Sequence, residues 1–232
     1  MRIADKIKPG MDALSVAKVI FEHHNILLLN FRIYQCEEKP HFAEVKVKNP
    51  KARRSVAEAL QHTSDFTEPL VVVQRIEDFA NIESVLSNLK RIEPEKTTIA
   101  SYIDPDEKEQ IYIHEALKLT SRVETKDGSF HIPLLDLDIS TDEIPHDFAF
   151  PYLREMSLHL GVNSGAIVNS GKSYHLYGLE LMNNDAWKTF MVKAGLLDRI
   201  DRRWLAHRML DKQANIRISP KWGKIPEVAY VF

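Results

Sequence analysis

Ile132-Pro-Leu-Leu-Asp-Leu-Asp-Ile-Ser140 is an apolar stretch interrupted by two acids, Asp136 and Asp138, with a single residue between them. Side chains alternate between the two faces of a β-strand, so this stretch predicts a strand whose carboxylates project side by side while its apolar residues enter the core. Paired carboxylates suit hard cations such as Mg²⁺ or Mn²⁺, and two such ions about 4 Å apart serve phosphoryl transfer. A strand end whose acids face water is the other interpretation.

The composition of the 232-residue chain limits which classes of protein it can belong to. Hydrophobic residues make up 44%, which is enough for a sizeable core. No apolar run approaches the ~20 residues of a membrane span, and the first residues lack the apolar block of a signal peptide, so we expect a cytoplasmic protein without membrane contact. The one cysteine, Cys36, excludes an internal disulfide and multi-cysteine zinc sites. A formal charge of −2 means that any nucleic-acid binding must use a local basic patch.

Helical and strand patterns alternate along the chain, and no Pro/Gly/Ser-rich linker or repeat interrupts them. Helices are predicted over 11–23, 50–61, 76–92, 104–122, 150–160, 184–196 and 202–210, and strands over 25–34, 42–47, 70–74, 97–103, 132–140 and 214–219. The helix over 104–122 is expected because Pro105 would occupy its first turn. Lys126-Asp-Gly128 is a turn signal before the acid-bearing strand. The alternation is typical of an α/β or α+β fold with helices packed on a central sheet.

A second motif lies in residues 166–178, Ala-Ile-Val-Asn-Ser-Gly-Lys-Ser-Tyr-His-Leu-Tyr-Gly. Its Gly171-Lys172-Ser173 fragment matches the end of a Walker phosphate loop. That loop requires a glycine five positions before Gly171, where Ala166 stands, and it must open a helix. The residues that follow alternate like a strand, so a Walker loop is excluded.

The same residues predict a β-hairpin with strands over 166–169 and 174–181 and a turn at Ser170-Gly171. Ser173 and His175 are two residues apart and share a strand face, and Lys172 lies at the turn. A hydroxyl, an ammonium and an imidazole together can hold a triphosphate through charge-assisted hydrogen bonds. A core histidine in an ordinary hairpin is the alternative.

A third motif, Ile200-Asp201, stands immediately before the helix predicted over 202–210. Asp201 is suited to be the N-cap of that helix, which is the structural interpretation of this acid. The strand that follows places Arg217 between two apolar residues, where a guanidinium requires an anionic partner.

A basic patch occupies the C-terminal part of the chain. From Trp187 onward, ten lysines and arginines stand against four acids. Trp204 and Trp222 lie within this patch and are either stacking surfaces for nucleic-acid bases or core residues.

Taken in this order, the three motifs resemble the archaeo-eukaryotic primase superfamily, which includes replicative primase small subunits, primase-polymerases and the polymerase domain of bacterial end-joining ligases. The family pattern is Asp-x-Asp flanked by apolar residues, then Ser-x-His, then an apolar residue followed by Asp. The corresponding residues here are Asp136-Leu-Asp138, Ser173-Tyr-His175 and Ile200-Asp201. The turn at Ser170-Gly171-Lys172 also resembles the ligase-type polymerase domains, and the similarity spans about residues 134–219.

The resemblance implies an α/β (α+β) fold in which an RRM-like catalytic sheet packs with an N-terminal α/β unit. The whole chain, 1–232, would be one catalytic domain, with an N-terminal α/β part over 1–125 and a metal- and nucleotide-binding part over 126–232. The implied activity is that of a DNA primase or primase-polymerase, which copies a single-stranded DNA template from NTPs or dNTPs in replication or repair.

The resemblance also implies the roles of individual residues. Two Mg²⁺ or Mn²⁺ ions would be held by Asp136, Asp138 and Asp201, with Asp198 and Asp211 as rivals for the third position. The triphosphate of the incoming nucleotide would be bound by Ser173, His175 and Lys172, with Arg217 as a further contact to nucleotide or template.

Departures from the family pattern leave two alternatives open. The zinc-binding cysteines of many replicative small subunits are absent from this sequence, so template capture is expected from a protein partner such as a helicase or an accessory subunit. A catalytically degenerate subunit that only binds nucleic acid is one alternative. A metal-dependent nuclease is the other, although Ser140-Thr-Asp-Glu143 after the acids lacks the lysine that such enzymes commonly use.

Overall fold

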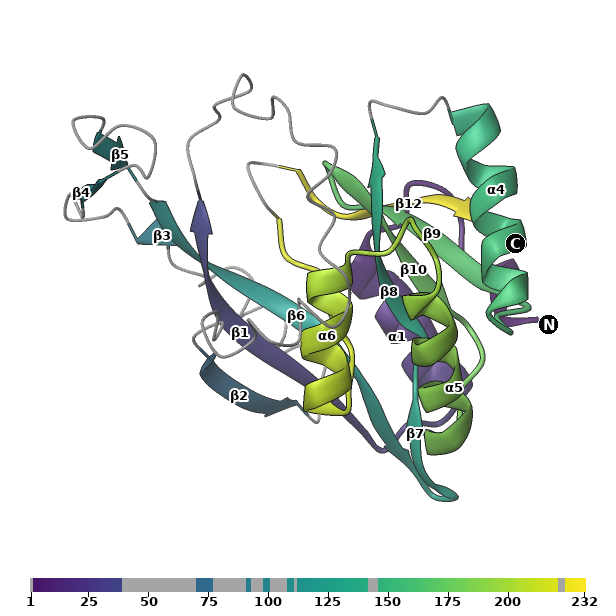
Figure 1. Ribbon diagram of the computed structural model, residues 1–232. Helices are drawn as coiled ribbons and strands as arrows, with labels where there is room; N and C mark the ends of the chain where they lie inside the picture. Colours follow the sequence, from purple (N-terminus) through teal and green to yellow (C-terminus); the bar gives the residue numbers. More distant parts are fainter. Residues whose placement is uncertain are drawn as a thin grey trace.

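The computed structural model describes residues 2–38, 70–76, 91–92, 98–100, 108–110, 112–141, 146–220 and 224–232. Two larger antiparallel sheets with helices around them, and a separate two-stranded sheet, form this part of the chain (Figure 1). The family-like α+β architecture expected from the sequence is therefore confirmed. Within the described residues, no helix combines the length and the apolar character needed to cross a membrane.

The first sheet, called here the β6 sheet, is built around the long strand β6 (Tyr112–Thr125). Its strands run in the order β11-β6-β1-β2, and two short strands also pair with β6. The bounds of these strands are Asn215–Arg217 for β11, Leu28–Glu38 for β1, Leu70–Ile76 for β2, Arg91–Ile92 for β3 and Gly128–His131 for β7. A separate two-stranded ribbon pairs β4 (Thr98–Ala100) with β5 (Lys108–Gln110).

The second sheet, called here the β8 sheet, has the order β12-β9-β10-β8 and carries two of the three motifs. Its strands are β12 (Glu227–Val231), β9 (Gly165–Asn169), β10 (Ser173–Gly178) and β8 (Leu134–Ser140). The strand with the two acids and the hairpin are confirmed where the sequence predicts them. Gly171 has φ +107° in the hairpin turn, a backbone conformation that strongly favours glycine.

The helices are η1 (Ile3–Lys6), α1 (Ala13–His23), α4 (His146–His159), α5 (Asn184–Gly195) and α6 (Arg202–Asp211). The helices α1, α4, α5 and α6 confirm four of the helices expected from the sequence. In Figure 1, α4 lies along the side of the β8 sheet away from the β6 sheet, and the stacked rings of Phe150 and Tyr230, 5.2 Å apart, join it to β12.

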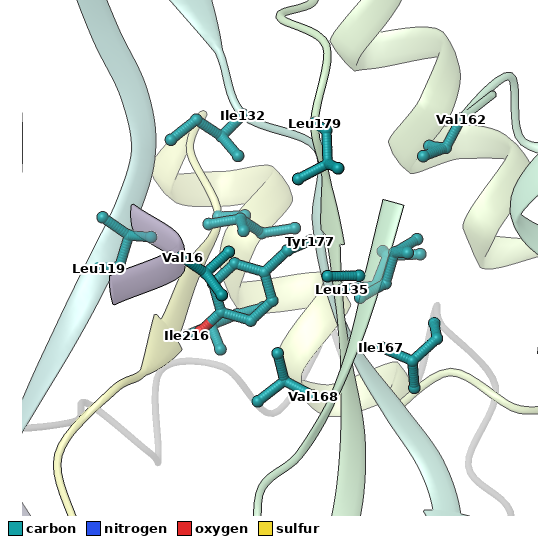
Figure 2. Packing of buried hydrophobic residues seen from close by; sticks show 14 of the residues in the cluster. Val16, Leu119, Ile132, Leu135, Val162, Ile167, Val168, Tyr177, Leu179 and Ile216 are labelled. Carbon is teal, nitrogen blue, oxygen red and sulfur yellow. The ribbon is translucent and has the colours of Figure 1, made fainter. Parts of the chain in front are cut away.

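One hydrophobic core lies between these elements. The apolar residues of β8 that flank the acids, Leu135, Leu137 and Ile139, are all buried. Figure 2 shows Leu135 and Tyr177 of the β8 sheet in one cluster with residues of the β6 sheet and of α1. The alternation predicted from the sequence is therefore confirmed, because the acids lie on one face of β8 and the face toward the core is wholly apolar.

The helix predicted over 104–122 is wrong, because the described residues from 108 onward form β5 and β6. Leu117, Leu119 and Val123 of β6 are buried, whereas Arg122 and Glu124 between and after them are exposed. This spacing has the period of a strand, and β6 is stabilised by pairing with β1 on one edge and β11 on the other. Pro105 at the start of the predicted helix is a local signal, and the pairing of β6 with its neighbouring strands outweighs it.

Other expected elements differ at their ends or fall outside the described residues. Ile76 belongs to β2 and Arg91–Ile92 forms β3, so the ends of the helix expected over 76–92 are strands, and β1 begins three residues later than expected. Residues 77–90 and the elements expected over 42–47 and 50–61 lie outside the described residues, as does Trp222.

Candidate functional site

The third motif lies against the first, because the chain before α6 runs antiparallel to β8. An isolated β-bridge pairs Leu137 with Ile200. On either side of it, the Asp201 amide donates to the Asp136 carbonyl at 3.2 Å and the Asp138 amide donates to the Arg199 carbonyl at 2.9 Å. Paired residues in such a ladder project from the same face, so this arrangement places Asp201 next to Asp136.

Asp201 is also the N-cap of α6, as the structural interpretation of the sequence requires. Its Oδ1 accepts a hydrogen bond of 2.8 Å from the Trp204 amide. The rival acids have other partners, since Asp198 pairs with Arg202 at 3.2 Å and Asp211 with Arg208 at 3.4 Å. Asp201 can therefore cap α6 and lie next to Asp136 at the same time, and the capping hydrogen bond orients its carboxylate.

His175 lies directly across from Asp136 in the β8–β10 ladder. Its Nε2 is 3.7 Å from Asp136 Oδ1. The histidine is buried, and among the residues that the structure describes its Nδ1 has no hydrogen-bond partner. Burial lowers the pKa of His175 to about 3, helped by the positive charges of Arg217 and Lys118, so the imidazole is neutral at pH 7. The contact between His175 and Asp136 is thus not an ion pair.

The electrostatics of Asp136 are unusual for a carboxylate whose side chain keeps 30% of its surface exposed. Burial first, then the negative charge of Asp201 and more weakly that of Asp138, raise its pKa from 3.8 to about 7 against the opposing charges of Lys118 and Arg217. At Asp136, burial and the like charges together therefore outweigh the effect of the nearby cations.

Lys118 is a site residue that the sequence does not single out. It lies on β6 directly across from Arg217 of β11, and its charge acts on the pKa of both Asp136 and His175. The wrong prediction of a helix over 104–122 is the reason that Lys118 is missed, because only a strand places Lys118 on the face opposite Leu117 and Leu119. The alternation of apolar and polar residues from Leu117 to Thr120 is the signal that could have found it.

The turn between β9 and β10 is internally hydrogen-bonded. Ser170 Oγ donates to the Ser173 carbonyl at 2.9 Å, and the Gly171 amide donates to Asn169 Oδ1 at 2.8 Å. Lys172 is exposed at the tip, and Ser173 is half-buried at the start of β10, two residues from His175. The turn therefore presents a hydroxyl and an ammonium beside the face that carries the acids.

Lys224 covers this turn from outside. A Cβ built on Gly171 would lie 3.2 Å from Lys224 Cδ and 3.5 Å from its Cβ, so the aliphatic stem of the lysine runs along the glycine. Long lysine side chains commonly lay the stem on a surface and keep the ammonium in water. In the sequence, the only indication of a role for Lys224 is the general basic character of the C-terminal part.

Arg217 has partners other than the anion expected from the sequence. Its Nη2 donates to the Ser170 carbonyl at 2.6 Å, and its Nη1 donates to the Ser219 carbonyl at 2.5 Å. Trp204, expected in the core or in a stacking role, is half-buried, and its Nε1 donates to the Asn215 carbonyl at 2.9 Å. Both side chains thus bind backbone carbonyl groups around β11.

The donor set fits a hard divalent ion in chemical type. Asp136 and Asp201 supply carboxylate oxygens in one place, and a bound cation would oppose the burial and the like charge that raise the pKa of Asp136. Among the described residues, however, no group of three or more histidine, cysteine, aspartate or glutamate side chains is already arranged to hold a metal ion. Asp138 is exposed, and its charge is the weakest of those that act on the pKa of Asp136.

The raised pKa of Asp136 predicts how the stability of the metal-free protein depends on pH. Between about pH 4 and pH 7 the folded state keeps a proton that the unfolded state has released, so this acid lowers the free energy of unfolding as the pH rises. His131 and His175, whose pKa values burial lowers to about 4 and about 3, act in the opposite sense below pH 6.5. The melting temperature of Asp136→Asn minus that of the wild type, measured in EDTA, should therefore increase from pH 5 to pH 8. The exposed acid Asp185 provides the control variant Asp185→Asn, and a constant difference for Asp136→Asn would contradict the assignment.

Comparison with known proteins adds one finding. No curated protein and no solved structure matches the chain. The sequence profile of the family described as Archaeo-eukaryotic primase 1D-like matches residues 96–229, more than half of the chain, and this range contains all three motifs as well as Lys118, Arg217 and Lys224. The chain therefore belongs to the archaeo-eukaryotic primases, in the 1D-like family.

Proposed function

We propose that the chain is a template-directed nucleotidyltransferase, a DNA primase or primase-polymerase, that joins nucleotides with the help of two divalent ions. The observation that carries this proposal is the pairing of β8 with β10, in which Asp136 lies across from His175 and the acids lie beside the turn of Lys172 and Ser173. A nucleoside triphosphate complexed with a divalent ion needs both kinds of group side by side.

Asp136, Asp138 and Asp201 would hold two Mg²⁺ or Mn²⁺ ions. When bound, such ions lower the pKa of an attacking hydroxyl and neutralise charge on the phosphates. The reaction forms a bond between the 3′-oxygen of the growing strand, or of a first nucleotide, and the α-phosphorus. The bond from that phosphorus to the β-phosphate oxygen breaks, pyrophosphate leaves and the hydroxyl proton passes to solvent.

The turn and its surroundings would bind the triphosphate. Lys172 supplies charge, Ser173 supplies a hydroxyl, and His175 would donate a neutral N–H, because its lowered pKa keeps the imidazole uncharged. Lys118 and Arg217 add positive potential behind these groups.

The basic C-terminal part would contact the single-stranded DNA template, and a helicase or an accessory subunit would deliver that template. We also propose that the chain acts as one catalytic domain, in which residues 1–125 support the metal- and nucleotide-binding part over 126–232. The β6 sheet supports this view, since it combines β1, β2 and β6 with β11 from the C-terminal part.

The test is incorporation of labelled NTPs and dNTPs on single-stranded DNA, with and without a primer, in Mg²⁺ and in Mn²⁺. Product that requires metal and template supports the proposal, and product without a primer identifies a primase. Absence of product in every condition, from folded protein that binds DNA, would contradict it.

A catalytically degenerate, nucleic-acid-binding subunit is the second candidate, and one observation favours it. Among the described residues the three acids do not form a ready three-donor cluster. Such a subunit would bind single-stranded DNA no more tightly in Mg²⁺ than in EDTA, and it would bind no nucleotide. Titration with a nonhydrolysable nucleoside triphosphate in Mg²⁺ distinguishes the two candidates, because only the transferase binds it.

Lys224 should contribute its charge to triphosphate binding if the turn binds phosphate. Lys224→Met keeps an unbranched apolar stem over Gly171 and removes only the ammonium. We expect the affinity for a nucleoside triphosphate in Mg²⁺ to fall about threefold to tenfold, the upper end being close to the lowest value for one charge-assisted hydrogen bond. Calorimetric titration measures this, with Lys188→Met on α5 as the matched control, since that exposed lysine pairs with Asp185 instead. Equal affinities for Lys224→Met and wild type would exclude the contact.

A further inference from the structure

β11 is tied to the two halves of the candidate site by side-chain hydrogen bonds. At its C-terminal end, Arg217 donates to the carbonyl of Ser170, the residue that opens the turn carrying Lys172 and Ser173. Arg217 belongs to the β6 sheet and Ser170 follows β9 of the β8 sheet, so this bond joins the two sheets at the turn.

At its N-terminal end, β11 is bound to the helix that begins at the third acid. Trp204 donates from its indole Nε1 to the carbonyl of Asn215 at 2.9 Å, and its backbone amide donates to Asp201 Oδ1 at 2.8 Å. One residue thus contacts both the carboxylate and the strand. A chain of hydrogen bonds therefore runs from Asp201 through Trp204 and β11 to Arg217 and Ser170.

The strand between these two contacts is well anchored. Ile216 and Ile218, on either side of Arg217, are buried, and the Ala214 amide before β11 donates to the buried Ser121 Oγ at 2.9 Å. Ile216 pairs with Leu119 of β6. A displacement of Asp201 or of the turn must therefore either break one of these contacts or move a strand that is fixed in the core.

We propose that β11 sets the distance between the third acid and the phosphate-binding turn, with Trp204 and Arg217 as its positioning residues. In this role Arg217 acts on the nucleotide through the Ser170 turn and not through a direct contact with phosphate. That the third acid binds metal and the turn binds phosphate rests on the proposed function, whereas the connection between them through β11 does not.

Amide hydrogen exchange of the nucleotide-free protein tests the connection without any activity. In Arg217→Met, exchange of the amides of residues 170–173 should accelerate about tenfold, the effect of losing one hydrogen bond that restrains a turn. Arg217→Lys should accelerate it as well, because a lysine cannot reproduce the two-carbonyl geometry of the guanidinium. Trp204→Phe, which keeps a ring but removes the donor, should accelerate exchange of the amides at the start of α6.

Arg154→Met on α4 is the control, since that exposed arginine makes only a surface pair with Glu155 within the part of the structure described. Kinetics supply the second readout. Positioning predicts that both Arg217 variants lower kcat with a smaller change in KM, and that lysine does not rescue. A direct phosphate contact predicts that Arg217→Met raises KM and that Arg217→Lys restores it.

Unchanged exchange at residues 170–173 in folded Arg217 variants would overturn the inference, and so would rescue of KM by lysine. If the Arg217→Met variant does not fold, Arg217→Lys and Trp204→Phe carry the same test. If the wild type binds no nucleotide, the proposed function fails, while the exchange measurement still decides whether β11 couples the two segments.

Discussion

Asp136→Asn is expected to reduce metal-dependent nucleotide incorporation at least about a hundredfold, since even residues that only orient a metal ligand cost 10- to 100-fold when lost. Asn has the shape of Asp but carries no charge, and the position lies between Asp201 and His175 in the ladder. Single-turnover incorporation of a labelled nucleotide, in Mg²⁺ and in Mn²⁺, measures the effect.

This loss should occur without loss of folding. Because burial raises the pKa of Asp136 to about 7, removing its charge should leave the metal-free protein at least as stable as the wild type at pH 8. Asp185→Asn on the exposed face of α5 should retain full activity. An Asp136→Asn enzyme within tenfold of the wild type would show that this acid holds no essential ion.

Gly178→Ala is expected to lower the free energy of unfolding by about 2–3 kcal/mol, the upper part of the range for overpacking a filled site. A Cβ at position 178 would lie 2.7 Å from Cβ and Cγ of Pro133, and the Gly178 amide already donates to the Pro133 carbonyl at 2.7 Å. Neither group can yield easily, because the proline ring is rigid and the hydrogen bond fixes the backbone distance. Urea denaturation followed by circular dichroism measures the change.

The same substitution should also weaken the site, since any shift of β10 relative to β8 moves His175 away from Asp136. Gly195→Ala is the matched control. Among the described residues its Cβ would meet only Leu205 Cδ2, at 3.3 Å, and alanine favours the end of α5, so we expect a change within about 1 kcal/mol. A Gly178→Ala protein as stable as the wild type would mean that the Pro133 contact can relax.

Several parts of the fold and of the site could be predicted from local patterns. The alternation around Asp136 and Asp138 identifies β8, the glycine at 171 identifies the hairpin turn, and an acid before an amphipathic run identifies the N-cap of α6. These signals succeed because strand period, positive φ and capping are decided within a few residues. The helix expected over 104–122 failed because Pro105 is a local signal as well, whereas β6 is stabilised by partners about 85 residues before it and 95 residues after it in the sequence.

The sequence by itself determined which residues can carry the chemistry. It fixes the acids, the Ser-x-His pair and the lysines, and the spacing within each motif decides which of its residues share a face. Only the tertiary structure decided which of these residues meet. The bridge between Leu137 and Ile200 brings Asp201 next to Asp136, and the contact between the two sheets brings Arg217 to the Ser170 carbonyl. Such contacts depend on the packing of buried strands such as β11, and no local pattern encodes that packing.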